Sequence, residues 1–93
     1  MILEIVSPES VLFKGEVNAV SLPGVDGSFQ ILNNHAPIVS ILKKGTVAVN
    51  ASNFVLNKDV EKKFNRVNDQ NFTLEILSGT IEMKNNKIIV LAD

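Results

Sequence analysis

Hydrophobic and polar residues alternate with a period of two along several stretches of the chain. The alternation is clearest over residues 2–7, 46–50 and 72–78. A period of two is that of a β-strand with one buried face. The run Lys87–Leu91 is apolar after its first residue and predicts a strand that is covered on both faces.

Turn signals separate these stretches at regular intervals. They are Ser7-Pro8, Lys14-Gly15, Pro23-Gly24, Asp26-Gly27, Asn33-Asn34, Lys44-Gly45, Ser78-Gly79 and Asn85-Asn86. Short strands broken every ~8–12 residues indicate a β-sandwich or barrel. Composition agrees, because Val, Ile and Thr, which favour pleated backbone, account for 24 of the 93 residues. We therefore expect one all-β domain over residues 1–93.

The Asn-rich segment Asn50–Asn71 has an ambiguous pattern. Val60, Phe64 and Val67 are spaced as on one face of a helix, but the same residues also fit a strand with a mixed face. Asparagine favours turns over either element. We expect a long β-hairpin with a loose tip over Asn50–Asn71, and a short helix is the alternative.

Composition excludes several classes of function. Nine Lys and Arg against ten Asp and Glu leave a net charge of −1, so no basic field exists to hold nucleic acid or an anionic membrane. The absence of Cys excludes disulfides and thiol chemistry, and a single His excludes His-rich metal sites. No apolar run approaches the ~20 residues of a membrane span, and Met1–Ile5 carries an acid where a signal peptide carries bases. We expect a cytosolic, non-catalytic domain without cofactor or metal.

His35-Ala36-Pro37 is the most suggestive short motif. Pro37 fixes its own φ and pushes Ala36 towards extended backbone, so the tripeptide forms a stiff corner that presents an imidazole. A general base needs a nucleophile and an orienting carboxylate within reach, and the chain has no G-x-S-x-G elbow. A structural or interface role is therefore favoured for His35. Pro23–Ser28 lacks the Gly-Lys-Ser/Thr of a phosphate loop and predicts a turn.

Lys84 supports a different function. It lies beside the Asn85-Asn86 turn and follows Met83, which is similar to the modified lysine at a hairpin tip in biotinyl and lipoyl carrier domains. Those domains place the lysine near the middle of the fold, whereas only nine residues follow Lys84. A carrier modified at Lys84 and a generic β-sandwich adaptor are the alternatives to the function considered next.

The segment Gly27–Ser40 closely resembles the signature of the epsilon subunit of F-type ATP synthase. It contains an Ile, a two-residue turn, His-Ala-Pro and a run of small apolar residues, and Ile41–Gly45 completes the pattern. The opening strands are similar over Leu3–Glu9 and Leu12–Val17, and the closing hairpin over Leu77–Met83 and Lys87–Asp93. The main departures are Ser28 in place of a frequent Glu, Asn33-Asn34 in place of a frequent Pro-Gly, and Thr80 in place of a frequent Gly.

The resemblance implies a flattened β-sandwich of two roughly five-stranded sheets that serves as a non-catalytic rotor part of the central stalk. Such a subunit would bind the gamma subunit with one face and rest on the c-ring. It would thereby couple proton or sodium flow to ATP synthesis in the alpha/beta head, which it meets only indirectly. It would be peripheral, on the cytoplasmic face of the bacterial plasma membrane, without inserting into it. The helical hairpin that follows this domain in most relatives, and its inhibitory role, are not carried over, because the sequence reaches Asp93 where the hairpin would begin.

The resemblance also implies two sets of docking residues. The c-ring-facing set is Val25, Asp26, Gly27, Ser28, Asn33, Asn34, His35, Ala36 and Pro37. The gamma-facing set is Ser7, Ile38, Val39, Ser40, Ile41 and Leu42. We expect the Asp26–Ser28 loop and the His35 corner to share one end of the sandwich. Neighbours on a strand point to opposite faces, so we expect either Val39 or Ser40, but not both, to face gamma, and we take Ser40 as that residue.

Overall fold

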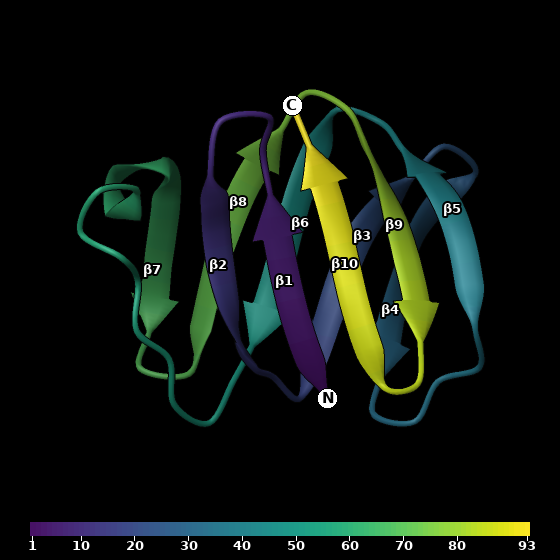
Figure 1. Ribbon diagram of the computed structural model, residues 1–93, viewed down its shortest axis with the longest axis horizontal. Helices are drawn as coiled ribbons and strands as arrows, with labels where there is room; N and C mark the ends of the chain where they lie inside the picture. Colours follow the sequence, from purple (N-terminus) through teal and green to yellow (C-terminus); the bar gives the residue numbers. More distant parts are fainter.

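Ten β-strands and one short 3₁₀ helix make up the chain in the computed structural model, which describes residues 1–93 (Figure 1). The elements in chain order are β1 (Ile2–Val6), β2 (Val11–Glu16), β3 (Ala19–Gly24), β4 (Gly27–Leu32), β5 (Ile38–Leu42), β6 (Gly45–Asn50), η1 (Glu61–Lys63), β7 (Phe64–Asn68), β8 (Asn71–Ile76), β9 (Gly79–Lys84) and β10 (Lys87–Ala92). The short strands and frequent turns confirm the all-β prediction.

The strands form two layers of five. The first layer has the order β2-β1-β10-β9-β5, and the second has the order β4-β3-β6-β8-β7. A single residue pair, Gly24 with Leu42, joins β3 to β5, so the two layers are one sheet curled onto itself. The pair of β1 with β10 is parallel and every other pair is antiparallel. The expected flattened sandwich of two five-stranded sheets is confirmed.

The core between the layers is entirely apolar. Twenty-three hydrophobic residues are buried there, and no polar or charged residue is buried. Alternation decides which residues face it: Ile88, Val90 and Ala92 of β10 are buried, whereas Leu91 between them is 53% exposed. The expectation that β10 is covered on both faces is therefore wrong for the chain alone, because the second layer covers only one side of it.

The segment after β6 differs from the expected long hairpin. β6 pairs with β8 and not with β7, so residues 51–63 must pass beyond β8 before β7 can add to its outer edge. Phe54 holds this crossing against the core, because its ring lies 4.6 Å from that of the buried Phe72. Arg66 in turn stacks on the Phe54 ring, with its guanidinium 4.3 Å from the ring centre. The hairpin is only β7–β8, and the helical alternative survives as the three-residue η1.

Candidate docking surfaces

The outer face of the first layer carries a mostly apolar row, in which three apolar side chains are exposed, one is half-buried and the fifth residue is a threonine. Strand register aligns one residue from each of the five strands across the layer. The row consists of Val11, Val6, Leu91, Thr80 and Ile41. Ile41 is 62% exposed and Leu91 53% exposed. The next row towards the other end is mixed, with Glu4, Glu82 and Lys14 among its members. Apolar surface is thus concentrated at the end of the layer where β1 finishes.

β5 divides its residues between this face and the core. Val39 and Ile41 are exposed, at 77% and 62%, whereas Leu42 is only 1% exposed. Ser40 is half-buried and lies opposite Ile81, a core residue, so it points inwards. The expectation that Ser40 is the partner-facing residue is therefore wrong, and Leu42 cannot meet a partner on this face. Of the gamma-facing set on β5, only Val39 and Ile41 present their side chains outwards.

A groove of 640 Å³ lies at the same end of the first layer. Its lining residues come from the ends of β1, β5, β9 and β10: Val6, Ser7, Pro8, Ile41, Leu42, Ser78, Gly79, Thr80, Leu91, Ala92 and Asp93. Ser78 donates a hydrogen bond of 2.7 Å to the Asp93 carboxylate, which closes one side of the groove. The fold thus brings Ser7 and Ile41 to the lining of one groove, although 33 residues separate the positions in the chain.

The loop Val25–Ser28 forms the tight turn between β3 and β4. All four residues are exposed, and Val25 retains 51% of its surface. Gly27 has a φ of 125°, a backbone conformation that side-chain-bearing residues rarely adopt. Lys43 donates its backbone N–H to the Pro23 carbonyl, so the β5–β6 turn lies beside this hairpin end. The loop therefore projects from the upper end of the sandwich (Figure 1). The groove lies at the same end, because Leu42, which lines it, pairs with Gly24 just before the loop.

His35 lies at the opposite end of the molecule. β4 begins at Gly27 and ends at Leu32, so the two loops that flank it are separated by its full length of about 17 Å. Figure 1 shows the β4–β5 loop at the lower end and the β3–β4 turn at the upper end. The expectation that Asp26–Ser28 and His35 share one end is therefore wrong. His35 itself is exposed, and its Nδ1 lies 2.6 Å from the carbonyl oxygen of Ala36.

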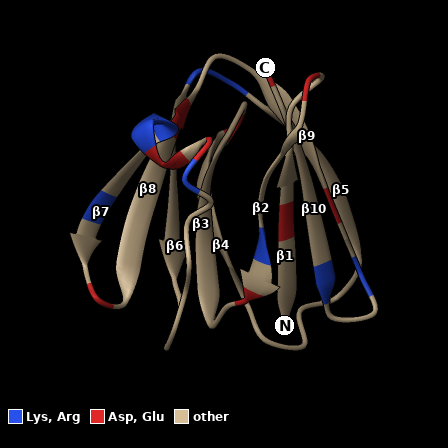
Figure 2. Cartoon of the chain, turned by 60° about the vertical axis from the view of Figure 1, so that its left-hand side comes forward, with Lys and Arg blue, Asp and Glu red and all other residues tan.

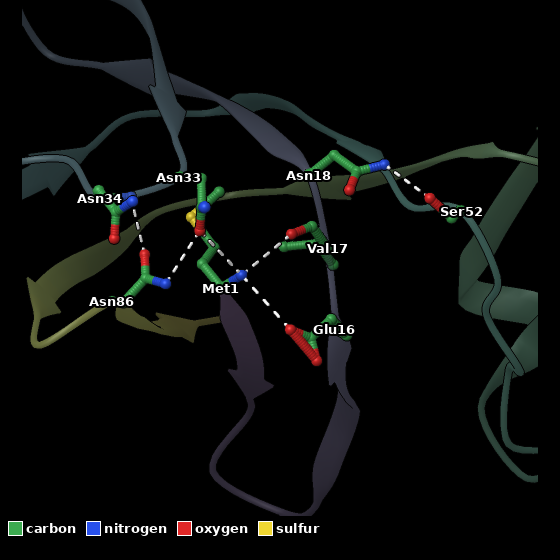
Figure 3. Close-up of polar contacts among 8 residues, drawn as sticks. All are labelled: Met1, Glu16, Val17, Asn18, Asn33, Asn34, Ser52 and Asn86. Carbon is green, nitrogen blue, oxygen red and sulfur yellow. Dashed lines mark hydrogen bonds and ion pairs between the residues drawn. The ribbon is translucent and has the colours of Figure 1, made fainter.

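A polar network surrounds the first residue at this lower end (Figure 3). The Met1 ammonium donates to the Val17 carbonyl (3.4 Å) and to Asn33 Oδ1 (3.2 Å), and it lies 3.7 Å from Glu16 Oε1. Asn86 Nδ2 also donates to Asn33 Oδ1 (2.9 Å). The network joins one ammonium to a backbone carbonyl, two side-chain amides and the Glu16 carboxylate, and it contains no arrangement of nucleophile and base.

The chain has almost no net charge and no group of side chains that could bind a metal ion. Basic and acidic residues are interspersed along strands and loops (Figure 2). No cluster of three or more His, Cys, Asp or Glu side chains is placed to hold a metal ion. The chain has no helix of the length and apolarity needed to cross a membrane.

The comparisons with known proteins decide the family. The family model for the ATP synthase delta/epsilon chain β-sandwich domain matches residues 1–60. The chain belongs to this family. The match covers β1 to β6 and the loop after it, and therefore includes both loops that flank β4.

Relatives of the delta/epsilon family extend the match to nearly the whole chain. The ATP synthase epsilon chain of Desulforamulus reducens is 40% identical over 98% of this chain. That of Chlorobaculum tepidum is 36% identical over the same share. The chain spans 57% of the length of the first relative and 86% of the second.

Solved structures of mitochondrial ATP synthase share the fold. A chain from the central stalk and c-ring structure of Tetrahymena thermophila superposes with a TM-score of 0.74 at 14% identity, over 99% of this chain and 62% of that one. A chain from the Euglena gracilis enzyme gives 0.77 at 16% identity, over 99% and 49%. At such identities the likeness concerns the fold alone, and it extends along 99% of this chain.

Two features of the site were not found from the sequence. The partners of Ile41 in the apolar row lie on β9, β10, β1 and β2, and only the strand register reveals them. The second is the pair of hydrogen bonds from the Asn86 side chain to the β4–β5 loop, because the sequence predicts only a turn at Asn85-Asn86. The sequence does contain a signal for it, because an Asn-Asn pair stands at both the β4–β5 turn and the β9–β10 turn.

Proposed function

We propose that this chain is the non-catalytic rotor subunit that links the gamma subunit to the c-ring in the central stalk of an F-type ATP synthase. It couples ion flow through the ring to ATP synthesis in the alpha/beta head. The observation that carries the proposal is the exposed apolar row on a delta/epsilon-type sandwich. A stable subunit interface has an apolar centre, and the row supplies one because Val11, Leu91 and Ile41 expose apolar side chains along a single line across the layer.

The gamma subunit occupies the outer face of the first layer. Val39 and Ile41 of β5 contribute apolar side chains, and Leu91 extends the surface to β10. The groove beside Ser7 gives this face the concave shape into which a partner side chain fits. We therefore keep Ser7, Val39 and Ile41 as gamma-facing residues and treat Ile38, Ser40 and Leu42 as support beneath them.

The c-ring meets the Val25–Ser28 end. Only one end of a rigid sandwich can rest on the ring, and the two expected loops lie at opposite ends. The four residues Val25–Ser28 are exposed, whereas Asn33 and Asn34 are engaged in hydrogen bonds within the chain. The His35 corner leads directly into β5, so we assign it to the border of the gamma-facing surface. For a bacterial cell, we propose that the domain is peripheral on the cytoplasmic face of the plasma membrane.

A pair of matched variants tests the gamma interface. Ile41→Arg places a cation in the apolar row, and Val67→Arg does the same on β7 of the second layer, where Val67 is 58% exposed. Both side chains are β-branched and similarly exposed, so both variants should fold equally well. We expect Ile41→Arg to weaken binding to cognate gamma at least about tenfold, because it buries an unpaired charge in the interface. We expect Val67→Arg to bind normally.

The outcome that overturns the proposal is equally concrete. If wild-type chain fails to co-purify with gamma and the c-ring, the rotor function is wrong. If both arginine variants bind gamma as well as wild type, gamma does not cover the first layer. Loss of c-ring association in Asp26→Ala, with gamma binding retained, would support the Val25–Ser28 end as the one that meets the ring.

A further inference from the structure

One side chain ties the β4–β5 loop to the β9–β10 hairpin. Asn86 Oδ1 accepts a hydrogen bond of 2.8 Å from the backbone N–H of Asn34, and Asn86 Nδ2 donates one of 2.9 Å to Asn33 Oδ1 (Figure 3). The single carboxamide thus uses both of its ends across segments that are 52 residues apart. The other contacts of the corner, from His35 N–H to the Leu32 carbonyl and from His35 Nδ1 to Ala36, are local.

The turn itself does not require this side chain. Asn85 and Asn86 have φ values of 53° and 59°, which glycine adopts at lower cost than asparagine. Asn85 is exposed, whereas Asn86 is half-buried against the other loop. Backbone geometry favours Asn or Gly at both positions, and at position 86 the asparagine side chain also makes the two hydrogen bonds to the other loop.

We propose that Asn86 is a positioning residue that fixes the His35-Ala36-Pro37 corner, which leads into β5, relative to the β9–β10 hairpin. It acts through Asn33 and Asn34 and needs no contact with a partner. Asn33 Oδ1 serves as the common acceptor, since it also receives the Met1 ammonium at 3.2 Å. The inference rests on the proposed function in one respect, namely that the corner borders the gamma-facing surface.

We call the two hydrogen bonds of the Asn86 side chain to Asn33 and Asn34 the latch. Amide hydrogen exchange of the isolated chain tests the latch without any partner. Asn86→Gly removes both hydrogen bonds and keeps the positive φ, and Asn85→Gly makes the same backbone change without removing a contact. We expect the Asn34 amide to exchange roughly 5- to 150-fold faster in Asn86→Gly, the range for loss of two neutral hydrogen bonds. Asn85→Gly should leave it unchanged. Equal exchange in the two variants would overturn the latch.

Asn33 offers a rescue experiment. In both of its contacts to Met1 and Asn86 the Asn33 side chain is the acceptor through Oδ1, so an aspartate can replace it. We expect Asn33→Asp to retain protection of the Asn34 amide and Asn33→Ala to lose it. If the aspartate behaves like the alanine, Asn33 does not act as the acceptor and the network is wrong.

Affinity for cognate gamma tests whether the positioning matters. When only a fraction of molecules hold the corner in the binding-competent position, the apparent dissociation constant rises in inverse proportion to that fraction. We expect Asn86→Gly to bind gamma about three- to tenfold more weakly than Asn85→Gly. Faster exchange of the Asn34 amide in Asn86→Gly, with unchanged affinity for gamma, would overturn the positioning role. Failure of wild type to bind gamma would overturn the proposed function and the positioning role together, while the exchange comparison would still decide the latch.

Discussion

Replacing Phe72 by alanine should destabilise the domain more than any other single core truncation on β8. Phe72 is fully buried, and three rings surround it at centroid distances of 4.9 Å (Phe13), 4.6 Å (Phe54) and 5.5 Å (Phe64). A buried Phe→Ala change costs about 3–5 kcal/mol, and each aromatic pair adds ~0.5–1.5 kcal/mol beyond area. Because three ring contacts are lost as well, we expect a loss of about 4–6 kcal/mol in the free energy of unfolding. That is a large part of the total stability of a chain of this length, which is about 5–14 kcal/mol.

The assay is urea denaturation followed by circular dichroism, with Phe72→Leu as the control. Leucine keeps most of the apolar volume and removes only the ring contacts, so its cost should be about 1–3 kcal/mol. Exchange of the amides of residues 54–66 should accelerate more than that of β1 and β10, because Phe54 docks on Phe72 and Arg66 docks on Phe54. A cost below about 2 kcal/mol for Phe72→Ala, or uniform acceleration throughout, would refute the view that this ring anchors the crossing segment.

Three further predictions concern single positions. Gly79→Ala should lower the melting temperature by several degrees, since a Cβ there meets the backbone oxygen of Leu91, and melting curves with and without the change would measure this. Gly27→Ala should cost about 1–2 kcal/mol through its φ of 125° alone, because the space around it is open; equal stability by urea titration would contradict this. Lys84 should carry no acyl group, so intact mass spectrometry of the chain purified from its own cells should give the unmodified mass, and an added biotinyl or lipoyl mass would favour the carrier alternative.

The sequence predicted the strands better than it predicted their neighbours. Period-two alternation depends on each strand having one apolar face, and that local property located strands such as β1, β6 and β8. Pairing is not local. β6 pairs with β8, so the residues between them cross an edge instead of forming one long hairpin, and nothing in the Asn-rich pattern distinguishes the two.

Errors in the candidate site have the same origin. Alternation correctly requires Val39 and Ser40 to point in opposite directions, but only the register with Ile81 decides that Ser40 is the inner one. The positions of the turns at 25–28 and 33–37 were read correctly, yet their relative placement follows from the length of β4, which separates them. The resemblance implied that both loops face the c-ring, and we expected them to share one end, but the length of β4 separates them.

The parallel pairing of β1 with β10 governs when the domain can be completed during synthesis. All strands of the second layer (β3, β4, β6, β7 and β8) have left the ribosome before β10 appears. In contrast, β1 has no partner on one edge until residues 87–91 emerge. An unpaired strand edge attracts other chains, so the β1–β2 hairpin is the aggregation-prone part of the nascent chain. The face that we assign to gamma is therefore the last to form. Binding of gamma must then wait until β10 has emerged, and a ribosome stalled before residue 87 should expose a chain that gamma does not bind.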